Sequence, residues 1–218
     1  MTDSQISKAQ VPVLWLVAGA NGVGKTTYAR DHIKSYSGTK SFVNLDEIAR
    51  GLSPFEPEAQ RVRAARVSLN YLNSVLEMPR PQNAALDLRK SISLETTLAG
   101  LTHLRTIDRA KANGWNVNML YFAVQSPELA LARIARRVSE GGHDIPEVDA
   151  RRRFQRSLHN FGLYAAKCDL WRVFDNNARP KVVAEGHGPC RSFLNFDHAV
   201  LPENLTGMLK ALPLCAET

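Results

Sequence analysis

Short apolar runs alternate with longer stretches of mixed polarity along the chain, and each run predicts one strand of a buried sheet. Residues 11–17 (VPVLWLV) are continuously apolar and end in Ala-Gly, which suits a strand covered on both faces. Further strands are expected at residues 42–44, 91–95, 116–124 and 170–174, with an edge strand at 181–184.

The stretches between these runs carry apolar residues at helical spacing. Helices are expected from about residue 25, over 57–77, 101–113 and 127–140, from 146 to about 166, and near 201–212. Ser126 and Pro127 supply an N-cap and a first helical residue. Strands that alternate with helices predict an α/β fold, with a mostly parallel sheet of five or six strands flanked by helices.

The length of 218 residues suits a single domain over residues 1–218. Residues 1–10 are a polar N-terminal segment, and residues 186–218 are a Gly- and Pro-punctuated tail whose role the pattern does not indicate. The first apolar run is too short to cross a bilayer, so we expect neither a membrane segment nor a signal peptide.

A glycine-rich segment lies between the first expected strand and the first expected helix. Residues 19–27 read GANGVGKTT and match the pattern GxxxxGK[ST], whose backbone N–H groups cradle phosphates. The nucleotide is expected to contact the whole segment: Gly19, Ala20, Asn21, Gly22, Val23, Gly24, Lys25, Thr26 and Thr27. Lys25 should bridge the β- and γ-phosphates of ATP, and Thr26 should ligate Mg²⁺. The alternative is a glycine-rich turn between core elements.

This segment predicts a P-loop NTPase or kinase fold without giving the reaction. The sequence has no Asn-Lys-x-Asp motif of the kind that GTPases use, and motor or transporter ATPases need a larger chain. A small α/β domain with a late arginine-rich segment is typical of small-molecule kinases. Such enzymes need a base for the acceptor hydroxyl, a carboxylate near the metal or acceptor, and a mobile cationic lid.

Two carboxylates follow expected strands, at the sheet edge where ligands bind in such folds. Asp46 is the candidate base that takes the proton of the acceptor, with Arg50 as a further acceptor-side residue. Glu95 ends the third expected strand close to Thr97, where it could organise Mg²⁺ through water or hold acceptor hydroxyls. The alternatives are helix caps, formed by Asp46 for one helix and by Glu95 with its threonines for the next.

Seven arginines between residues 133 and 156 predict a helical lid over the triphosphate. In the second helix, apolar residues 154, 158, 161 and 165 share one face and place Arg152 on the other. Arg133, Arg137 and Arg152 are the candidates for catalytic contacts to phosphate oxygens. The alternative is a solvated basic face. His143, between the helices, is expected to stabilise the loop rather than to catalyse.

Composition limits the partners and the compartment. A formal charge of +7 favours an anionic partner, but the concentration of arginines at the expected lid and the scarcity of interleaved aromatics disfavour nucleic acid. Three widely spaced cysteines without a CxxC pair favour reduced thiols in a cytoplasm.

Four segments occur in the order GANGVGKTT, FVNLDEIARGLSPFEPE, SLETTLAG and GGHDIPEVDARRRFQRSLHNF. Together they resemble the zeta-toxin family of P-loop kinases in its compact bacterial form, over about residues 11–185. The resemblance implies transfer of phosphate from ATP to the sugar of UDP-N-acetylglucosamine, and a possible antitoxin partner. It assigns Asp46 as the catalytic aspartate, Lys25 and Thr26 as the loop lysine and metal-binding hydroxyl, and Glu95 with Thr97 as the acceptor side.

The sequence is also compatible with three other functions. The first is a kinase for another hydroxyl, on a nucleoside, an antibiotic or a polynucleotide end. The second is a nucleic-acid-binding P-loop NTPase, and the third is a regulator that binds nucleotide without chemistry.

Overall fold

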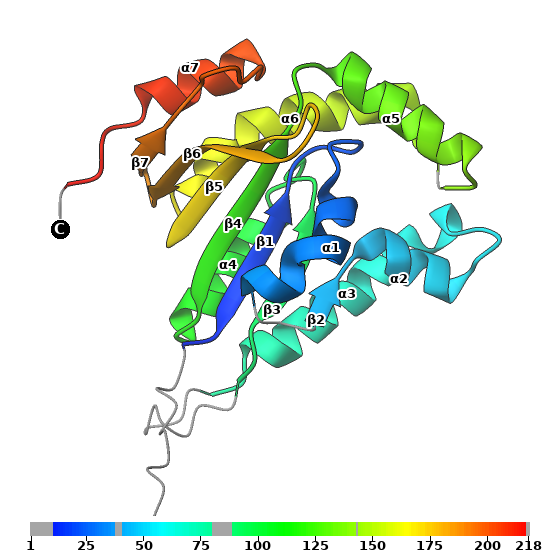
Figure 1. The fold of residues 1–218 in the computed structure, drawn as a ribbon. Helices are drawn as coiled ribbons and strands as arrows, with labels where there is room; N and C mark the ends of the chain where they lie inside the picture. The colour runs from blue at the N-terminus through cyan, green and yellow to red at the C-terminus, as the bar shows by residue number, and fades with distance from the viewer. Residues whose placement is uncertain (1–10, 38–40, 80–88, 143, 217–218) are drawn as a thin grey trace, which may run out of the picture.

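A seven-stranded sheet forms the centre of the computed structural model, which describes residues 11–37, 41–79, 89–142 and 144–216 (Figure 1). The strand order is β2-β3-β1-β4-β5-β6-β7, with β1 to β5 parallel and β6 and β7 antiparallel to their neighbours. The strands are β1 Val13–Ala18, β2 Ser41–Val43, β3 Ile92–Thr96, β4 Asn116–Ala123, β5 Leu170–Asp175, β6 Lys181–His187 and β7 Cys190–Leu194. The expected α/β fold with a mostly parallel sheet is confirmed.

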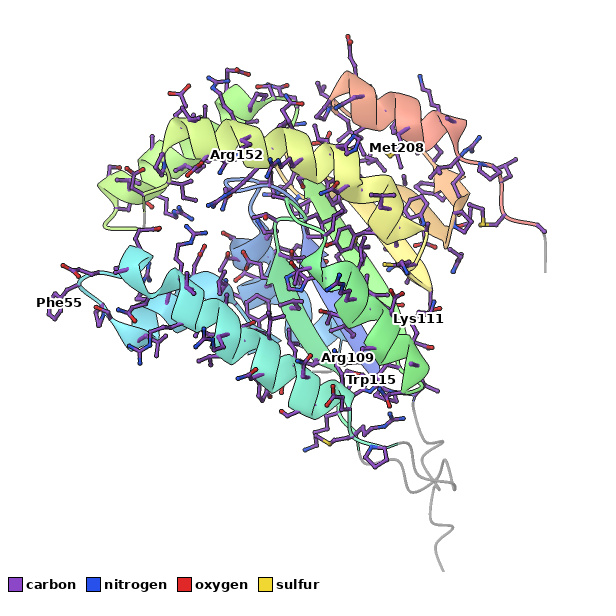
Figure 2. The ribbon with its side chains drawn as sticks, turned by 180° about the vertical axis from the view of Figure 1, so that it is seen from behind. Phe55, Arg109, Lys111, Trp115, Arg152 and Met208 are labelled. Atoms are coloured by element: carbon purple, nitrogen blue, oxygen red, sulfur yellow. A yellow bond between two sulfur atoms is a disulfide. The ribbon has the colours of Figure 1, made fainter. Side chains whose placement is uncertain are left out.

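Helices connect the strands and cover the sheet. Helix α1 lies on one face, and α4 and α6 lie on the other (Figures 1 and 2). The helices are α1 Lys25–Ser37, α2 Leu45–Leu52, α3 Arg61–Leu76, α4 Thr102–Ala112, α5 Pro127–Ser139, α6 Glu147–Ala165 and α7 Glu203–Ala211. Helix α2 was considered only as the helix that Asp46 would cap, and a 3₁₀ turn at Glu58–Gln60 precedes α3 within the expected helix 57–77.

The core follows the apolar pattern of the sequence. Every residue of β1 after Val13 is buried, as suits a strand between two others in a covered sheet. The expected apolar face of α6, which includes Phe154, Leu158 and Phe161, is buried against the sheet. This burial fixes the rotation of α6 about its axis. It thereby decides which arginines of α6 face the cavities beside the glycine-rich loop.

The C-terminal part differs from the expected sheet. Residues 181–184 were expected to form the edge, but β6 lies inside the sheet because β7 pairs with it. Strand β7 is short and leaves Phe193 42% exposed, so it lacks the buried apolar run by which the other strands are recognised. The sheet therefore has seven strands instead of five or six.

The cysteines also differ from expectation. Cys190 and Cys215 form a disulfide with their Cα atoms 5.0 Å apart, so the expectation of reduced thiols is wrong for this pair. Sequence spacing could not show that the C-terminal residues return beside β7, where Cys215 donates its backbone N–H to Arg191. Cys168 is a free, buried thiol whose pKa burial raises to about 12.

Two further expectations concern residues outside those described, namely the polar segment 1–10 and the role of His143. Among the described residues, no helix combines the length and apolarity needed to cross a membrane.

Candidate functional site

The glycine-rich segment forms a tight loop between the end of β1 and the start of α1. Three glycines take positive φ angles, 132° at Gly19, 78° at Gly22 and 92° at Gly24. A Cβ at Gly22 would lie 2.3 Å from the carbonyl oxygen of Ala130, and one at Gly24 would lie 2.4 Å from Nδ2 of Asn176. Glycine is therefore required at both positions, by backbone conformation and by close packing.

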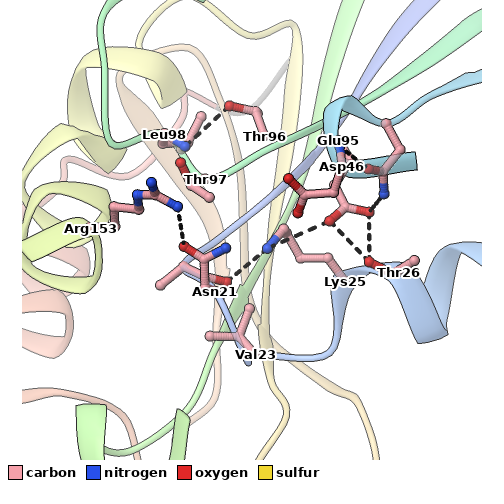
Figure 3. A network of polar contacts seen from close by, with 12 residues as sticks. Asn21, Val23, Lys25, Thr26, Asp46, Glu95, Thr96, Thr97, Leu98 and Arg153 are labelled. Atoms are coloured by element: carbon pink, nitrogen blue, oxygen red, sulfur yellow. Dashed lines mark hydrogen bonds and ion pairs between the residues drawn. The ribbon is translucent and has the colours of Figure 1, made fainter. Parts of the chain in front are cut away.

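Lys25 is the buried cation at the base of the loop. Its side chain is 5% exposed, its Nζ donates to the carbonyl of Ala20 at 2.7 Å, and it lies 3.8 Å from Oε1 of Glu95 (Figure 3). Burial lowers the pKa of Lys25, and the negative charges of Glu95 and Asp46 oppose that shift. The ammonium group thus sits in a poorly solvated space, where contacts to a charged ligand are stronger than in water.

Glu95, at the end of β3, gathers polar groups from two other elements. Its two carboxylate oxygens lie 3.0 and 2.9 Å from Oγ1 of Thr26, and Nδ2 of Asn44 donates to Oε2 at 2.9 Å (Figure 3). Burial raises the pKa of Glu95, while Lys25 and these hydrogen bonds oppose the shift. Parallel strands β1, β2 and β3 end at one edge of the sheet, which explains why three distant segments meet here.

Neither carboxylate caps a helix. The N-cap of α2 is Asn44, whose Oδ1 accepts from the backbone N–H groups of Asp46 and Glu47, and this leaves the Asp46 carboxylate free to face the cavities. Thr96 and Thr97 accept from the backbone two residues on, at Leu98 and Ala99, before α4 begins. The capping alternatives for Asp46 and Glu95 are therefore wrong.

Two cavities open on this edge of the sheet. One, of about 480 Å³, runs over the glycine-rich loop and past Arg133, Arg137 and Asn176. The other, of about 340 Å³, extends over α3 and the start of α4 past Arg61, Thr97 and Arg153. Both cavities are lined by the same four residues, Asn21, Lys25, Asp46 and Glu95. Two molecules, one in each cavity, would meet at these four residues, three of which are charged.

The arginines of α5 and α6 differ in what they face. Arg133 and Arg137 both line the first cavity, and both terminal nitrogens of Arg133 also donate to the backbone carbonyls of Asn176 and Asn177 at 2.8 Å. Arg152 is 53% exposed, pairs with Asp149 at 2.6 Å and lines neither cavity. Its neighbour Arg153 instead lines the second cavity. The structure thus brings Arg133 and Arg137, but not Arg152, to the cavity over the loop. The helical lid stays a prediction.

Arg50 also lies away from the two cavities. It borders a small pocket next to Asp46, and its guanidinium lies 4.0 Å from the carboxylate of Glu47. Helix α2 turns Arg50 outward because Ala49 occupies the buried face.

Several residues that line the two cavities were not singled out as candidates from the sequence. Arg153 reaches Oδ1 of Asn21 at 3.4 Å, as Figure 3 shows, and Arg61 and His103 line the second cavity. Asn176 directly follows β5, so the rule that selected Asp46 and Glu95 at strand ends could have found it. Arg61 carries no such signal, because a basic residue at the start of a helix is ordinarily solvated.

The oxygen ligands at the site suit a hard cation held partly by phosphate. Among the described residues, no group of three or more His, Cys, Asp or Glu side chains could hold a metal ion. Mg²⁺ commonly takes only one or two protein oxygens and completes its coordination with water and substrate phosphates. Thr26 and Glu95 are oxygen donors of that kind, close to the loop.

Comparisons with known proteins bear on the fold and the family. A sequence family described as Zeta toxin matches residues 1–184. An uncharacterized protein of Haemophilus influenzae is 28% identical over 131 residues, which are 59% of this chain and 83% of that protein.

Comparison with solved structures bears on the fold alone. The AvrRxo1-ORF1:AvrRxo1-ORF2 complex with ATP aligns with a TM-score of 0.65 and 18% identity, over 95% of this chain and 66% of the matched chain. The PezAT toxin-antitoxin system of Streptococcus pneumoniae aligns with a TM-score of 0.59 and 18% identity, over 81% of this chain and 71% of that chain. This chain therefore spans slightly less than two thirds of the matched AvrRxo1 chain. At these identities the likeness shows the shared fold.

Proposed function

The chain belongs to the zeta toxin family, and from that premise we propose that it is an ATP-dependent kinase that phosphorylates a hydroxyl of a small molecule. The observation that carries this proposal is the meeting of two cavities at Lys25, Asp46 and Glu95. A hydrolase needs room for ATP and water only, whereas a second cavity of about 340 Å³ is large enough for an organic acceptor.

In this proposal the first cavity holds ATP. The loop amides and the start of α1 face the phosphates, and Lys25 contacts the β- and γ-phosphates. Thr26 and Glu95 would hold Mg²⁺, which when bound neutralises charge on the transferring phosphate. Arg137 lies on the same cavity and would stabilise the charge that develops on the γ-phosphate.

The second cavity holds the acceptor, with its hydroxyl next to Asp46. The carboxylate accepts the hydroxyl proton as the acceptor oxygen bonds to the γ-phosphorus and the bond from that phosphorus to the ADP oxygen breaks. Arg61, Arg153 and Thr97 offer cationic and hydroxyl groups to the rest of the acceptor. An anionic nucleotide sugar such as UDP-N-acetylglucosamine fits this lining, and the family resemblance points to the same acceptor.

The wider setting follows from the family. We propose that an antitoxin protein restrains the kinase and that the reaction takes place in the cytoplasm. PezAT is a toxin-antitoxin system, and AvrRxo1-ORF1 forms a complex with AvrRxo1-ORF2, which supports a protein partner for this chain.

An acceptor screen tests the proposal. Purified protein with ATP and Mg²⁺ is offered UDP-N-acetylglucosamine, other UDP-sugars, nucleosides, aminoglycosides and 5′-hydroxyl oligonucleotides, and ³¹P NMR follows each mixture. The proposal predicts a new phosphomonoester signal with UDP-N-acetylglucosamine. Turnover of a different small acceptor alone would reject the UDP-sugar, and turnover of oligonucleotides alone would reject the small-molecule kinase.

Arg137 should matter to the rate far more than Arg152. Arg137→Ala is expected to lower kcat about tenfold to a hundredfold, because a hydrogen bond to a charged group contributes about 1.5–3 kcal/mol. Arg152→Ala is the matched control, because this exposed arginine pairs only with a neighbour on its own helix. Steady-state kinetics should show the control within about twofold of wild type. Similar losses in both variants would contradict the assignment.

Arg153 should affect the acceptor rather than ATP. Arg153→Ala is expected to raise the KM of an anionic acceptor about tenfold, since one charge-assisted contact is lost, with the KM of ATP nearly unchanged. Arg156→Ala, an exposed arginine one turn further along α6, serves as the control. A rise in the KM of ATP instead would move Arg153 to the donor side.

A further inference from the structure

The segment directly after β5 contacts the glycine-rich loop through the side chain of Asn176. Asn176 is 7% exposed, and its Nδ2 donates to the carbonyl of Val23 at 2.7 Å. The same Nδ2 lies 2.4 Å from the position that a Cβ on Gly24 would take. Asn176 also lines the first cavity. One buried amide group therefore contacts the loop at the two residues before Lys25.

The hydrogen bond from Asn176 to Val23 orients a whole peptide group and not the carbonyl alone. In a trans peptide the C=O and the following N–H point in opposite directions, so holding the carbonyl of Val23 also sets the direction of the N–H of Gly24. A phosphate-binding loop depends on several such N–H groups facing the same ligand. Asn176 thus determines the orientation of one of the groups that cradle phosphate in the proposed function.

Asn176 is itself held in place on three sides. Its backbone N–H donates to Ala123 at 2.9 Å, and Arg133 donates to the carbonyls of residues 176 and 177 at 2.8 Å each. The carboxylate of Asp175 accepts from the backbone N–H groups of Asn177 at 2.9 Å and Val200 at 3.0 Å. Bonds from β4, α5 and the C-terminal part therefore converge on this short segment and leave Asn176 little freedom to turn away.

We propose that Asn176 is a positioning residue for nucleotide binding, which holds the Val23–Gly24 peptide in the orientation that receives phosphate. The role rests on the proposed ATP site but concerns a residue that does not need to touch the reacting atoms. Arg133 acts in the same assembly, because its guanidinium donates to the backbone carbonyls of residues 176 and 177.

Two measurements on Asn176→Ala test the role. Calorimetry with ADP and Mg²⁺ is expected to show about tenfold weaker binding, since one buried hydrogen bond and the order of the loop are lost. Hydrogen exchange of the ligand-free protein is expected to be faster at the amides of residues 22–26 than in wild type. The exchange measurement does not depend on kinase activity, so it can succeed even where the proposed function fails.

Ile107→Ala is the matched control, because Ile107 is fully buried in α4 and lines neither cavity. It should lower the melting temperature while the affinity for ADP stays within about twofold of wild type. Asn176→Asp is a second variant with the same shape, in which an oxygen replaces the donor that faces the carbonyl of Val23. Weak ADP binding and fast loop exchange in both Asn176 variants, with normal binding in the control, support the role. Unchanged loop exchange, or an equal loss of affinity in Ile107→Ala, overturns it.

Discussion

Replacing Lys25 by alanine is expected to lower phosphoryl transfer about 10³-fold or more and to weaken ATP binding strongly, with the fold retained. The ammonium group is 5% exposed and lies at the junction of the two cavities. Its contact with phosphate would form in a poorly solvated space, and no other lysine lines either cavity among the described residues. Its loss would also leave Glu95 without the adjacent positive charge.

Calorimetry with ATP and steady-state kinetics measure this effect, and a thermal melt checks that the variant is folded. Lys111→Ala is the control for removal of a lysine charge, because Lys111 pairs with Asp169 and lines neither cavity. Wild-type ATP affinity in folded Lys25→Ala would contradict the assignment of the glycine-rich loop as the nucleotide site.

Replacing Asp46 by asparagine is expected to lower kcat by about 10² to 10⁴, the range of general base catalysis by a positioned side chain. The affinity for ATP should stay close to wild type, because asparagine keeps the size of the side chain and removes only a negative charge near the phosphates. This separation between kcat and nucleotide affinity distinguishes a base from a structural residue. Rapid-quench measurement of a single turnover reports the chemical step directly.

Glu47→Gln is the matched control for Asp46. Glu47 is the next residue on α2, its side chain is 46% exposed, and it pairs with Arg30 outside the two cavities. The kinetics of the Glu47→Gln variant should match those of wild type. If Asp46→Asn transfers phosphate at the wild-type rate, another group or water takes the proton, and the assignment of the base is rejected.

The sequence was most informative where one local rule decides the structure. The GxxxxGK[ST] pattern located the tight loop, because glycines with positive φ and close neighbours leave few alternatives. Asp46 and Glu95 were found by the rule that ligands bind at the carboxyl ends of parallel strands, and the structure brings both to the loop. Their catalytic and metal-binding roles, like those of the loop residues, remain predictions.

The sequence was least informative where the outcome depends on packing between distant elements. Periodicity identified the buried face of α6, but adjacent arginines on a helix differ by about 100° in direction, so it did not distinguish Arg152 from Arg153. That choice depends on where the loop lies relative to α6. Strand β7 and the Cys190–Cys215 disulfide depend on how the last residues return to the sheet, which no local pattern records.

In the proposed reaction the γ-phosphate of ATP is transferred to a hydroxyl of a small molecule bound next to Asp46. Incubation with [γ-³²P]ATP, Mg²⁺ and a pool of UDP-sugars, nucleosides and other small alcohols tests it most directly, with separation of organic phosphate from inorganic phosphate. We expect one labelled phosphomonoester for each ADP formed by the wild type, and little label in Asp46→Asn. Release of the label only as inorganic phosphate would contradict it.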